Sequence, residues 1–558
     1  STNGSSEEIF VFLRAKDTGR LHRLTRIDYC YNTTRYDLCD SANYTTRIVP
    51  GEYELVYERG EFSSGTISET GSGDAFPNGF RILDSSVVVT AGANTLDIDI
   101  PTTGVSGTVT LDGSTLPATN GSSEDIFLYA RASDTGRLHR LVRIDYCYNT
   151  TRYDLCDADT YQTNLPPGTY DIVYERGEFS SGTISETGSG DAFGNGYRVI
   201  DHGVTISGGS MTLDIDIPKA TVSGTFTLDG AALPTTNGSS EDLFFYLRAT
   251  DTGRLHRLAR VDYCYNTTRY DLCDADTYST NLPPGDYDLV YERGEFSSGT
   301  ISETSSGDAF PNGFRVLRSG ITIGAGANTL DVDIPKATVT GTITVNGSPL
   351  PQVNGSSEDL FFYLKAADTG RLHRLTRVDY CYNTTRYDLC DSDTYSTNLP
   401  PGDYALVYER GEFSSGTISE TATGDALPNV FRVLSPTVTL TAGANTVDID
   451  IPMSTLSGDI TLDGSALPAT NVSSEDLFLY LEARDTGRLH RLERIDYCYN
   501  TTRYDLCDAS TYTTNLPPGD YDVVYERGEF SSGTISETSS DDVIPNGYRV
   551  LDACVAVP

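Results

Sequence analysis

Alternation of apolar and polar residues is the main pattern along this chain. It is clear in residues 95–101, 104–113 and 168–177, which read TLDIDIP, GVSGTVTLDG and GTYDIVYERG. In the last of these, Tyr170, Ile172 and Tyr174 fall on one face. A period of two is that of a β-strand with one buried face. No window carries an apolar stripe with the helical period of 3.6, so the pattern predicts half-buried strands.

Turn residues separate these runs at short intervals. Glycine, proline and asparagine gather in LDGSTLP at 111–117, LPPGTY at 165–170 and GNGY at 194–197. Several short strands with turn signals between them are typical of a two-sheet sandwich. We therefore predict an all-β fold.

The same strands recur along the chain in five copies. The thirteen residues DYCYNTTRYDLCD begin at Asp28 and return unchanged at Asp145, Asp262, Asp379 and Asp496, a period of 117 residues. A unit of this length can bury its own core, so five small domains are favoured over one large one. The predicted units are 1–101, 102–218, 219–335, 336–452 and 453–558, numbered 1 to 5 below.

The order VSGTVTLDG…LP, EDIFLYAR, LPPGTYDIVYE resembles carboxypeptidase-regulatory-like or transthyretin-like β-sandwiches, which recur in repeat arrays of bacterial surface proteins. The resemblance covers every unit. It implies a linear tandem array of Ig-like or transthyretin-like sandwiches that act as spacers, adhesive modules or sugar-binding platforms. Short joints such as DIDIPKAT at 214–221 lack a flexible spacer, so we expect a semi-rigid rod.

The two terminal units are incomplete. The chain has 27 residues fewer than five full periods, and the segment without a counterpart is the one from Ala91 to Pro117. Unit 1 thus lacks its first strand and unit 5 its last. An incomplete sandwich exposes an unpaired edge that invites strand addition from another chain.

The composition of the chain argues against some classes of binding partner and indicates the compartment in which the protein is found. The formal charge is −39, which argues against binding to nucleic acid or to an anionic membrane, and no apolar run is long enough to span a membrane. Ten of the eleven cysteines form one pair per unit, which predicts disulfides and an extracellular or cell-surface location. The predicted pairs are Cys30–Cys39, Cys147–Cys156, Cys264–Cys273, Cys381–Cys390 and Cys498–Cys507.

The repeated thirteen residues read as a disulfide-stapled hairpin. Placing Cys30 opposite Cys39 puts Tyr31 opposite Leu38 and leaves Thr34 and Arg35 at the tip. Recent duplication would explain the lack of change. A repeated contact with a neighbouring unit or chain would explain it as well.

Two further polar blocks are equally unchanging while the core strands vary. They are DTGRLHRL at 17–24 and YERGEFSSGTISET at 57–70 with their copies. Our hypothesis is that such blocks form one contact per unit, in which basic residues could face acidic ones. The basic set is Arg20, His22, Arg23, Arg26 and Arg35, and the acidic set is Asp28, Asp37, Glu58 and Glu61.

Catalytic and metal motifs are weak throughout. Each copy of DTGRLHRL holds one histidine, His22 in unit 1, with no nucleophile motif around it. We therefore interpret this histidine as structural and predict no enzyme. The cysteine spacing does not suit zinc. Calcium is a candidate for loops such as GSGDAFPNG at 71–79, although no D-x-D-x-D-G loop occurs. No other cofactor is predicted.

The sequence also carries signals for N-glycosylation and an additional cysteine. Two asparagines per unit lie in N-glycosylation sequons. The first set is Asn3, Asn120, Asn237, Asn354 and Asn471, and the second is Asn32, Asn149, Asn266, Asn383 and Asn500. The eleventh cysteine, Cys554, has no counterpart in other units and suggests an intermolecular disulfide.

Taken together, these features predict the subunit of an extracellular filament. Its partner would be a second copy, joined head to tail, with strands exchanged between the incomplete terminal units. The alternative is a monomeric cell-surface adhesin or stalk that binds a glycan or a protein through its repeated faces.

Overall fold

The computed structural model describes most of the chain. It describes residues 2–558 except 34, 61, 64, 72, 178, 181–182, 268, 295, 298–299, 306, 412, 415–416, 422–424, 501–502, 529, 532–533, 536–537 and 539–541. The described residues form strands and turns without helices, which confirms the predicted all-β class. None of them belongs to a helix that could cross a membrane.

Unit 2 shows the complete fold of one repeat. Its strands are β10 (Thr103–Leu111), β11 (Ser114–Thr115), β12 (Thr119–Asn120), β13 (Ile126–Ala132), β14 (Leu138–Ile144), β15 (Tyr146–Asn149), β16 (Arg152–Leu155), β17 (Thr160–Leu165), β18 (Gly168–Arg176), β19 (Phe179–Ser180), β20 (Thr183–Ile184), β21 (Gly196–Ile206), β22 (Gly209–Thr212) and β23 (Ile215–Ile217). Units 3 and 4 repeat them as β24–β37 (220–334) and β38–β51 (337–451).

Two main sheets enclose the core of each unit. In unit 2, one sheet has the order β21-β18-β13-β14, and the other places β10 between β17 and the pair β22 and β23. The core between them holds Val105 and Val109 from β10, Leu128 from β13 and Ile172 from β18, all at most 1% exposed. These are the apolar positions of the alternating pattern, so each unit is the predicted β-sandwich.

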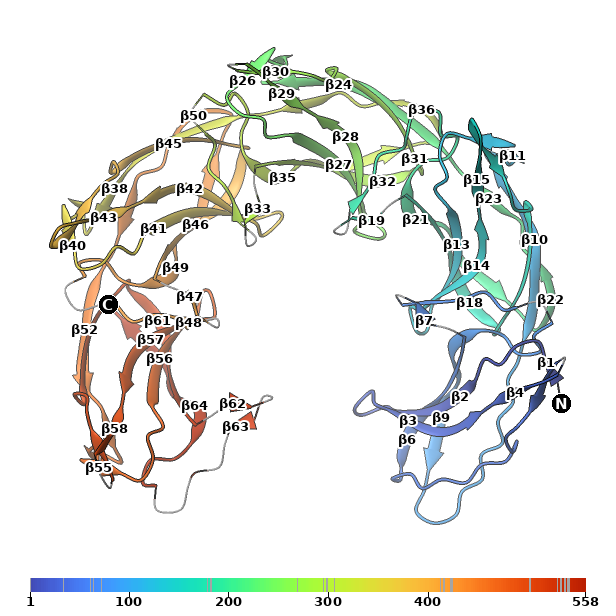
Figure 1. The fold of residues 1–558 in the computed structure, drawn as a ribbon, viewed down its shortest axis with the longest axis horizontal. Coiled ribbons are helices and arrows are strands. Elements are labelled where there is room, and N and C mark those ends of the chain that lie inside the picture. The colour runs from blue at the N-terminus through green and yellow to red at the C-terminus, as the bar shows by residue number, and fades with distance from the viewer. Residues whose placement is uncertain are drawn as a thin grey trace.

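The five units follow an open arc (Figure 1). The predicted tandem array of sandwiches is confirmed, and the array curves. A short joint does limit bending between units, but the direction of the next unit is set by side contacts between sandwiches, which the joint sequence does not reveal. The stapled hairpins, such as β29 (Tyr263–Asn266) and β30 (Arg269–Leu272), lie on the convex rim of the arc (Figure 1).

Units 1 and 5 contain part of the strand set of unit 2. Unit 1 contains β1 (Thr2–Asn3), β2 (Ile9–Ala15), β3 (Leu21–Ile27), β4 (Tyr29–Asn32), β5 (Arg35–Leu38), β6 (Gly51–Arg59), β7 (Phe62–Ser63), β8 (Thr66–Ile67) and β9 (Gly79–Val89). Unit 5 contains β52 (Ser454–Asp459), β53 (Thr461–Leu462), β54 (Ser465–Ala466), β55 (Thr470–Asn471), β56 (Leu477–Ala483), β57 (Arg488–Ile495), β58 (Tyr497–Asn500), β59 (Arg503–Leu506), β60 (Thr511–Leu516), β61 (Gly519–Arg527), β62 (Phe530–Ser531), β63 (Thr534–Ile535) and β64 (Gly547–Val557).

The absence of the β10 counterpart changes its neighbours in unit 1. Residues 43–48 match β17 and residues 92–100 match the segment of β22 and β23, yet neither stretch forms a strand. In unit 2 both stretches pair with β10. These segments thus become strands only when β10 supplies the ladder, which shows how far strand formation depends on context.

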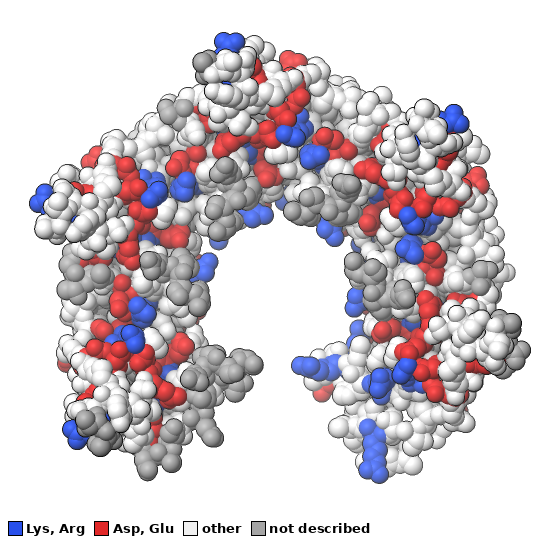
Figure 2. Space-filling view, in the orientation of Figure 1, with Lys and Arg blue, Asp and Glu red and all other residues white. Residues whose placement is uncertain are grey.

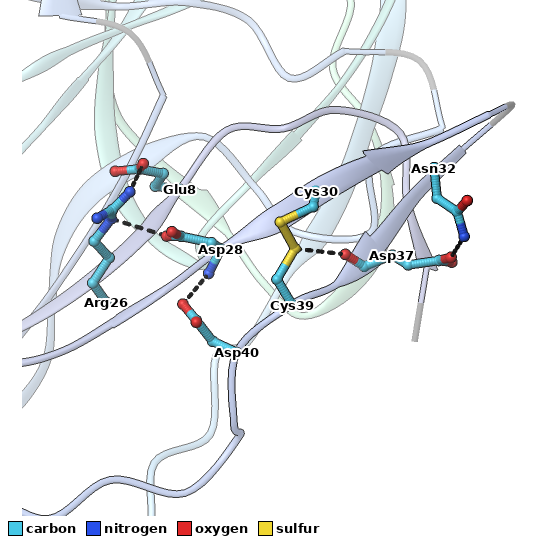
Figure 3. The surroundings of a disulfide bond; sticks show 8 residues. All are labelled: Glu8, Arg26, Asp28, Cys30, Asn32, Asp37, Cys39 and Asp40. Carbon is cyan, nitrogen blue, oxygen red and sulfur yellow. Dashed lines mark hydrogen bonds and ion pairs between the residues drawn. A yellow bond between two sulfur atoms is a disulfide. The ribbon is translucent and has the colours of Figure 1, made fainter.

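The stapled hairpin has a different register from the predicted one. Cys30 lies opposite Asp37, and Tyr31 lies opposite Tyr36. The turn is therefore centred one residue earlier, beginning at Thr33 with a positive φ of 52°. The two cysteines are diagonal neighbours, with Cα atoms 5.7 Å apart, and they form the predicted disulfide, as do the pairs in the other four units (Figure 3).

A fully buried arginine organises the loops at one end of each sandwich. In unit 1 it is Arg59, whose side chain is 0% exposed. Its guanidinium donates to the carbonyl of Phe76 at 2.9 Å, to Oδ1 of Asn78 at 2.6 Å and to the hydroxyl of Ser5 at 2.8 Å. It also pairs with buried Asp74 at 3.2 Å. The counterparts are Arg176, Arg293, Arg410 and Arg527.

Replacing Arg293 by methionine should destabilise unit 3 strongly. The substitution leaves the buried carboxylate of Asp308 without its cation, and breaking a buried pair costs about 3–5 kcal/mol. Native-state hydrogen exchange within residues 220–334 measures this loss. The matched control is Arg269→Met in the exposed hairpin, for which we expect about 1 kcal/mol or less. Equal effects of the two substitutions would contradict the assigned role of Arg293.

Candidate functional site

The unchanging polar blocks meet at the junction between consecutive units. Strand β8 of unit 1 pairs in parallel with β14 of unit 2, Thr66 with Leu138 and Ile67 with His139. The hairpin of β7 and β8 thereby extends the sheet of the next unit. It covers an edge that would otherwise present unpaired backbone groups. The same pairing joins units 2 and 3, units 3 and 4, and units 4 and 5.

The histidine of the repeated block lies at the centre of this junction. His139 is 0% exposed, and its Nε2 accepts the backbone N–H of Phe80 from unit 1 at 3.4 Å. Its ring packs edge-on against Tyr170 at 5.6 Å. Burial, with a contribution from Arg81, lowers the pKa of His139 to about 3. The imidazole is therefore neutral at physiological pH and acts as an acceptor.

An arginine of the preceding unit completes the contact around that histidine. Arg81 is 6% exposed, pairs with Asp134 at 3.1 Å and lies 4.5 Å above the ring of Tyr170. Asp134 also accepts the backbone N–H of Ile82 at 3.0 Å. Gly168 is required here, because a Cβ atom at this residue would lie 2.0 Å from the guanidinium of Arg81. The arginine therefore fits into a space that the next unit leaves open.

A second group of hydrogen bonds continues toward the outer sheet of the next unit. The hydroxyl of Thr70 donates to the carbonyl of Asn164 at 2.7 Å, and the amide of Asn164 donates to the carbonyl of Asp74 at 3.0 Å. Glu69 forms an ion pair with Arg140. The glutamate–arginine pair recurs at all four junctions. The threonine–asparagine hydrogen bonds recur at the first three.

The hypothesis of one contact per unit is confirmed for the blocks DTGRLHRL and YERGEFSSGTISET, whose residues meet at the junction, although the residues assigned to it were only partly right. His22, Arg20 and Arg23 belong to the block that forms the contact, but in unit 1 they are exposed, because no unit precedes them in the structure. Arg26 instead pairs with Asp28 at 2.9 Å within its own unit (Figure 3). Asp37 accepts a hydrogen bond from Asn32. Glu61 and the side chain of Arg35 lie outside the described residues.

The sequence patterns did not reveal several of the junction residues. Arg81 lies outside the predicted blocks, and Asp134 and Thr70 were predicted only as members of their blocks. A signal for Arg81 existed, because an aromatic residue followed by arginine recurs at the same place in every unit, at 80–81, 197–198, 314–315, 431–432 and 548–549. This recurring pair did not stand out, because the residues of the strand around it vary between units.

The two sets of sequons have different surroundings. Asn3, Asn120, Asn237, Asn354 and Asn471 are 5–9% exposed. In units 1–4, their amide nitrogens donate to the carbonyl two residues further on. Asn32 and its counterparts are exposed on the stapled hairpin. Only this second set presents its side chain on the surface of the folded chain.

The other candidate sites were the loop considered for calcium and the unpaired cysteine. Asp74 in the loop considered for calcium pairs with Arg59. In the described part of the chain, no three His, Cys, Asp or Glu side chains are grouped to hold a metal ion. Cys554 is exposed with a free thiol, and its backbone N–H donates to Asp522.

Figure 2 shows acidic side chains along the body of the arc, interrupted by basic ones, with basic side chains at the outermost points of the rim. The hairpin arginines Arg152, Arg269, Arg386 and Arg503 have side chains that are 58–63% exposed. The negative charge is thus distributed over every unit, as expected from the sequence.

Comparison with known proteins identifies no relative. No family model matches this chain, and no curated protein matches it. Among solved structures, a leucine-rich repeat protein from Bacteroides thetaiotaomicron matches with 13% identity and a TM-score of 0.14 over 42% of this chain. This chain covers only 26% of that protein.

Two further structures are similar over most of their own length. A streptococcal ancillary pilin matches with 12% identity and a TM-score of 0.16, over 62% of this chain and 98% of the pilin. A putative adhesin from Bacteroides ovatus matches with 12% identity and a TM-score of 0.17, over 44% of this chain and 98% of the adhesin. At these scores the matches carry no argument about what this chain does. The resemblance to carboxypeptidase-regulatory-like sandwiches stays a prediction.

The neutral histidine predicts that the junction weakens in mild acid. His256 keeps a pKa of about 3 when the junction is closed, against an ordinary value of 6.5. Between these values the opened junction binds one more proton, so acidification favours opening. We expect a loss of about 2 kcal/mol in the free energy of opening between pH 6.5 and about pH 5.

Hydrogen exchange of the Tyr197 amide, which donates to His256, measures this opening after correction for the intrinsic rate. The control is His256→Gln, which keeps an acceptor but does not titrate and should remove most of the pH dependence. An unchanged dependence in this variant would contradict the account.

Proposed function

We propose that this chain is a non-catalytic structural subunit of an extracellular surface filament, assembled head to tail through the junction described above. The observation that carries the proposal is that both halves of the junction are repeated in every unit. The contact is heterologous, because unit n always offers one face and unit n+1 the other. A contact of this kind does not close on itself in a pair and is the geometric requirement for a fibre.

The outer faces of the terminal units support this assembly. Unit 1 keeps Asp17, His22 and Gly51, the counterparts of Asp134, His139 and Gly168, and the first two are exposed. Unit 5 keeps Arg549, the counterpart of Arg81, also exposed. Near it, Val550 and Leu551 are 52% and 61% exposed. Docking unit 5 of one copy onto unit 1 of another would cover this apolar surface, which favours association.

Unit 1 departs from the other units at two junction positions. Arg47 stands where the next unit has Asn164, and Val49 stands where it has Pro166. Val49 is 74% exposed. The junction between chains would therefore lack the asparagine hydrogen bond. The arginine–aspartate pair and the histidine acceptor remain available to it.

The arc of Figure 1 gives the proposed filament a shape. The four internal junctions share the strand pairing, the histidine acceptor and the arginine–aspartate pair, so a further junction of this kind continues the curvature. A filament built in this way winds instead of running straight. Exchange of strands between the terminal units is not required for it, because residues 94–101 pack against unit 1 itself through Leu96, Ile98 and Ile100.

One observation favours the alternative of a monomeric adhesin or stalk. Each stapled hairpin presents a tyrosine, such as Tyr148, that is 67% exposed and packs against a second tyrosine, Tyr153, at 5.4 Å. Exposed aromatic side chains repeated along the convex rim would suit a ligand that is itself repetitive, such as a glycan. Disulfides in every unit support an extracellular or cell-surface location for either function.

Electron microscopy of charge-reversal variants tests the filament proposal. Wild-type protein should form winding filaments. Arg549→Asp should stop their growth, because it faces Asp17 across the contact and breaks a pair worth about 3 kcal/mol or more. Asp17→Arg should do the same, and the combined variant should restore filaments. Separate arcs from wild-type protein would contradict the proposal and leave the adhesin.

A further inference from the structure

An acidic side chain occupies the same place on the sheet surface of units 2 and 3. In unit 2, Asp171 of β18 pairs with Arg131 of β13 at 2.8 Å. Its Oδ1 also accepts the backbone N–H of Gly203, which lies at an irregularity of β21, at 3.0 Å. Unit 3 repeats both contacts with Asp288, Arg248 and Gly320. An arginine and one backbone N–H thus hold a carboxylate between neighbouring strands.

Units 1 and 5 also have a carboxylate at this place. In unit 5, Asp522 pairs with Arg484 at 2.8 Å and accepts the backbone N–H of Cys554 at 2.9 Å. The pair is kept although its arginine lies two residues further along the chain than in unit 2. In unit 1, Glu54 pairs with Arg14. An acidic side chain held by an arginine therefore fills this place in units 1, 2, 3 and 5.

Unit 4 lacks the carboxylate but keeps a cation. Ala405 stands at the place of Asp171, and Lys365 stands at the place of Arg131. Lys365 forms no ion pair with any acidic residue that the structure describes. An open cavity of about 550 Å³ lies at this place, and its lining includes Lys365, Ala366, Ala405, Pro436 and Thr437. The substitution of alanine for aspartate thus leaves a lysine beside an open space.

The lining of this cavity suits a carboxylate. Thr437 stands at the place of Gly203, whose N–H holds the aspartate in unit 2, and it adds a hydroxyl donor. Asp403 also lines the cavity, but its Oδ1 accepts the hydroxyl of Thr439 at 2.7 Å, and the ammonium of Lys365 stays unpaired. The volume lies within the range of sites for small molecules, about 300–1,000 Å³.

We propose that this cavity in unit 4 is a binding site for a small organic acid. The carboxylate of the ligand takes the place that Asp171 fills in unit 2, with Lys365 supplying the positive charge and Thr437 a hydrogen bond. The apolar part of the ligand lies against Ala405 and Pro436. Because the ion pair is exposed to solvent, binding is weak, with a dissociation constant of about 10 mM. Binding at this site does not require filament formation.

Lysine NMR of the full chain tests the site, because the chain has four lysines, Lys16, Lys219, Lys336 and Lys365. Methylation with a ¹³C label marks each ammonium and keeps its charge. Lys365→Arg identifies the signal of Lys365. At constant ionic strength and pH 7, butyrate should shift this signal until it saturates. Butyramide, the neutral analogue, should leave it in place, and the other three lysines serve as internal controls that shift much less.

The variant Ala405→Asp makes the test specific to the cavity. It restores the side chain that units 2, 3 and 5 have at this position, so we expect it to fold normally. Its carboxylate competes for Lys365 within the same chain, and it should weaken butyrate binding about tenfold or more.

Three results would overturn the proposal. The first is an equal shift of all four lysines with butyrate, which is the behaviour of general ionic association. The second is an unchanged response of Lys365 in Ala405→Asp. The third is an equal response to butyramide, which would show that the carboxylate is not recognised.

Discussion

Each unit depends on one guanidinium group that is removed completely from water. Arg59 and its counterparts are buried together with an aspartate, an asparagine amide and backbone carbonyls, so that the charge is compensated within the protein. A buried ion pair of this kind adds little net stability, but the loss of one partner is costly. It therefore holds the loop from Asp74 to Asn78 in one conformation.

Hydrogen bonds connect that loop to the next unit. The backbone N–H of Asn78 donates to Thr70, whose hydroxyl donates in turn to Asn164 across the junction. The strand that follows the loop carries Arg81 to Asp134 and presents the Phe80 N–H to His139. The core of one sandwich and the orientation of the next are thus linked by hydrogen bonds, and this explains why polar blocks are kept between copies while core strands vary.

The sequence was sufficient for the strands, the repeat and the disulfides, because alternation and internal comparison report on them directly. It was insufficient where strand formation or register depends on which segment lies beside a strand. Residues 43–48 match β17 of unit 2 but form no strand without a partner beside them. The hairpin register was misplaced because the prediction set Cys30 opposite Cys39, whereas the turn at Thr33 makes them diagonal. The sequon at Asn3 gave no sign that this side chain is buried and accepts a hydrogen bond from the backbone N–H of Ala75.

The central claim is that side contacts at the junctions, and not the short joints, fix an arc. Small-angle X-ray scattering of the wild-type chain at low concentration and neutral pH tests this most directly. The account predicts a scattering curve that the arc of Figure 1 reproduces, with a maximum dimension well below that of five units placed end to end. A maximum dimension equal to the fully extended array, or the scattering of a flexible chain of independent units, would contradict it.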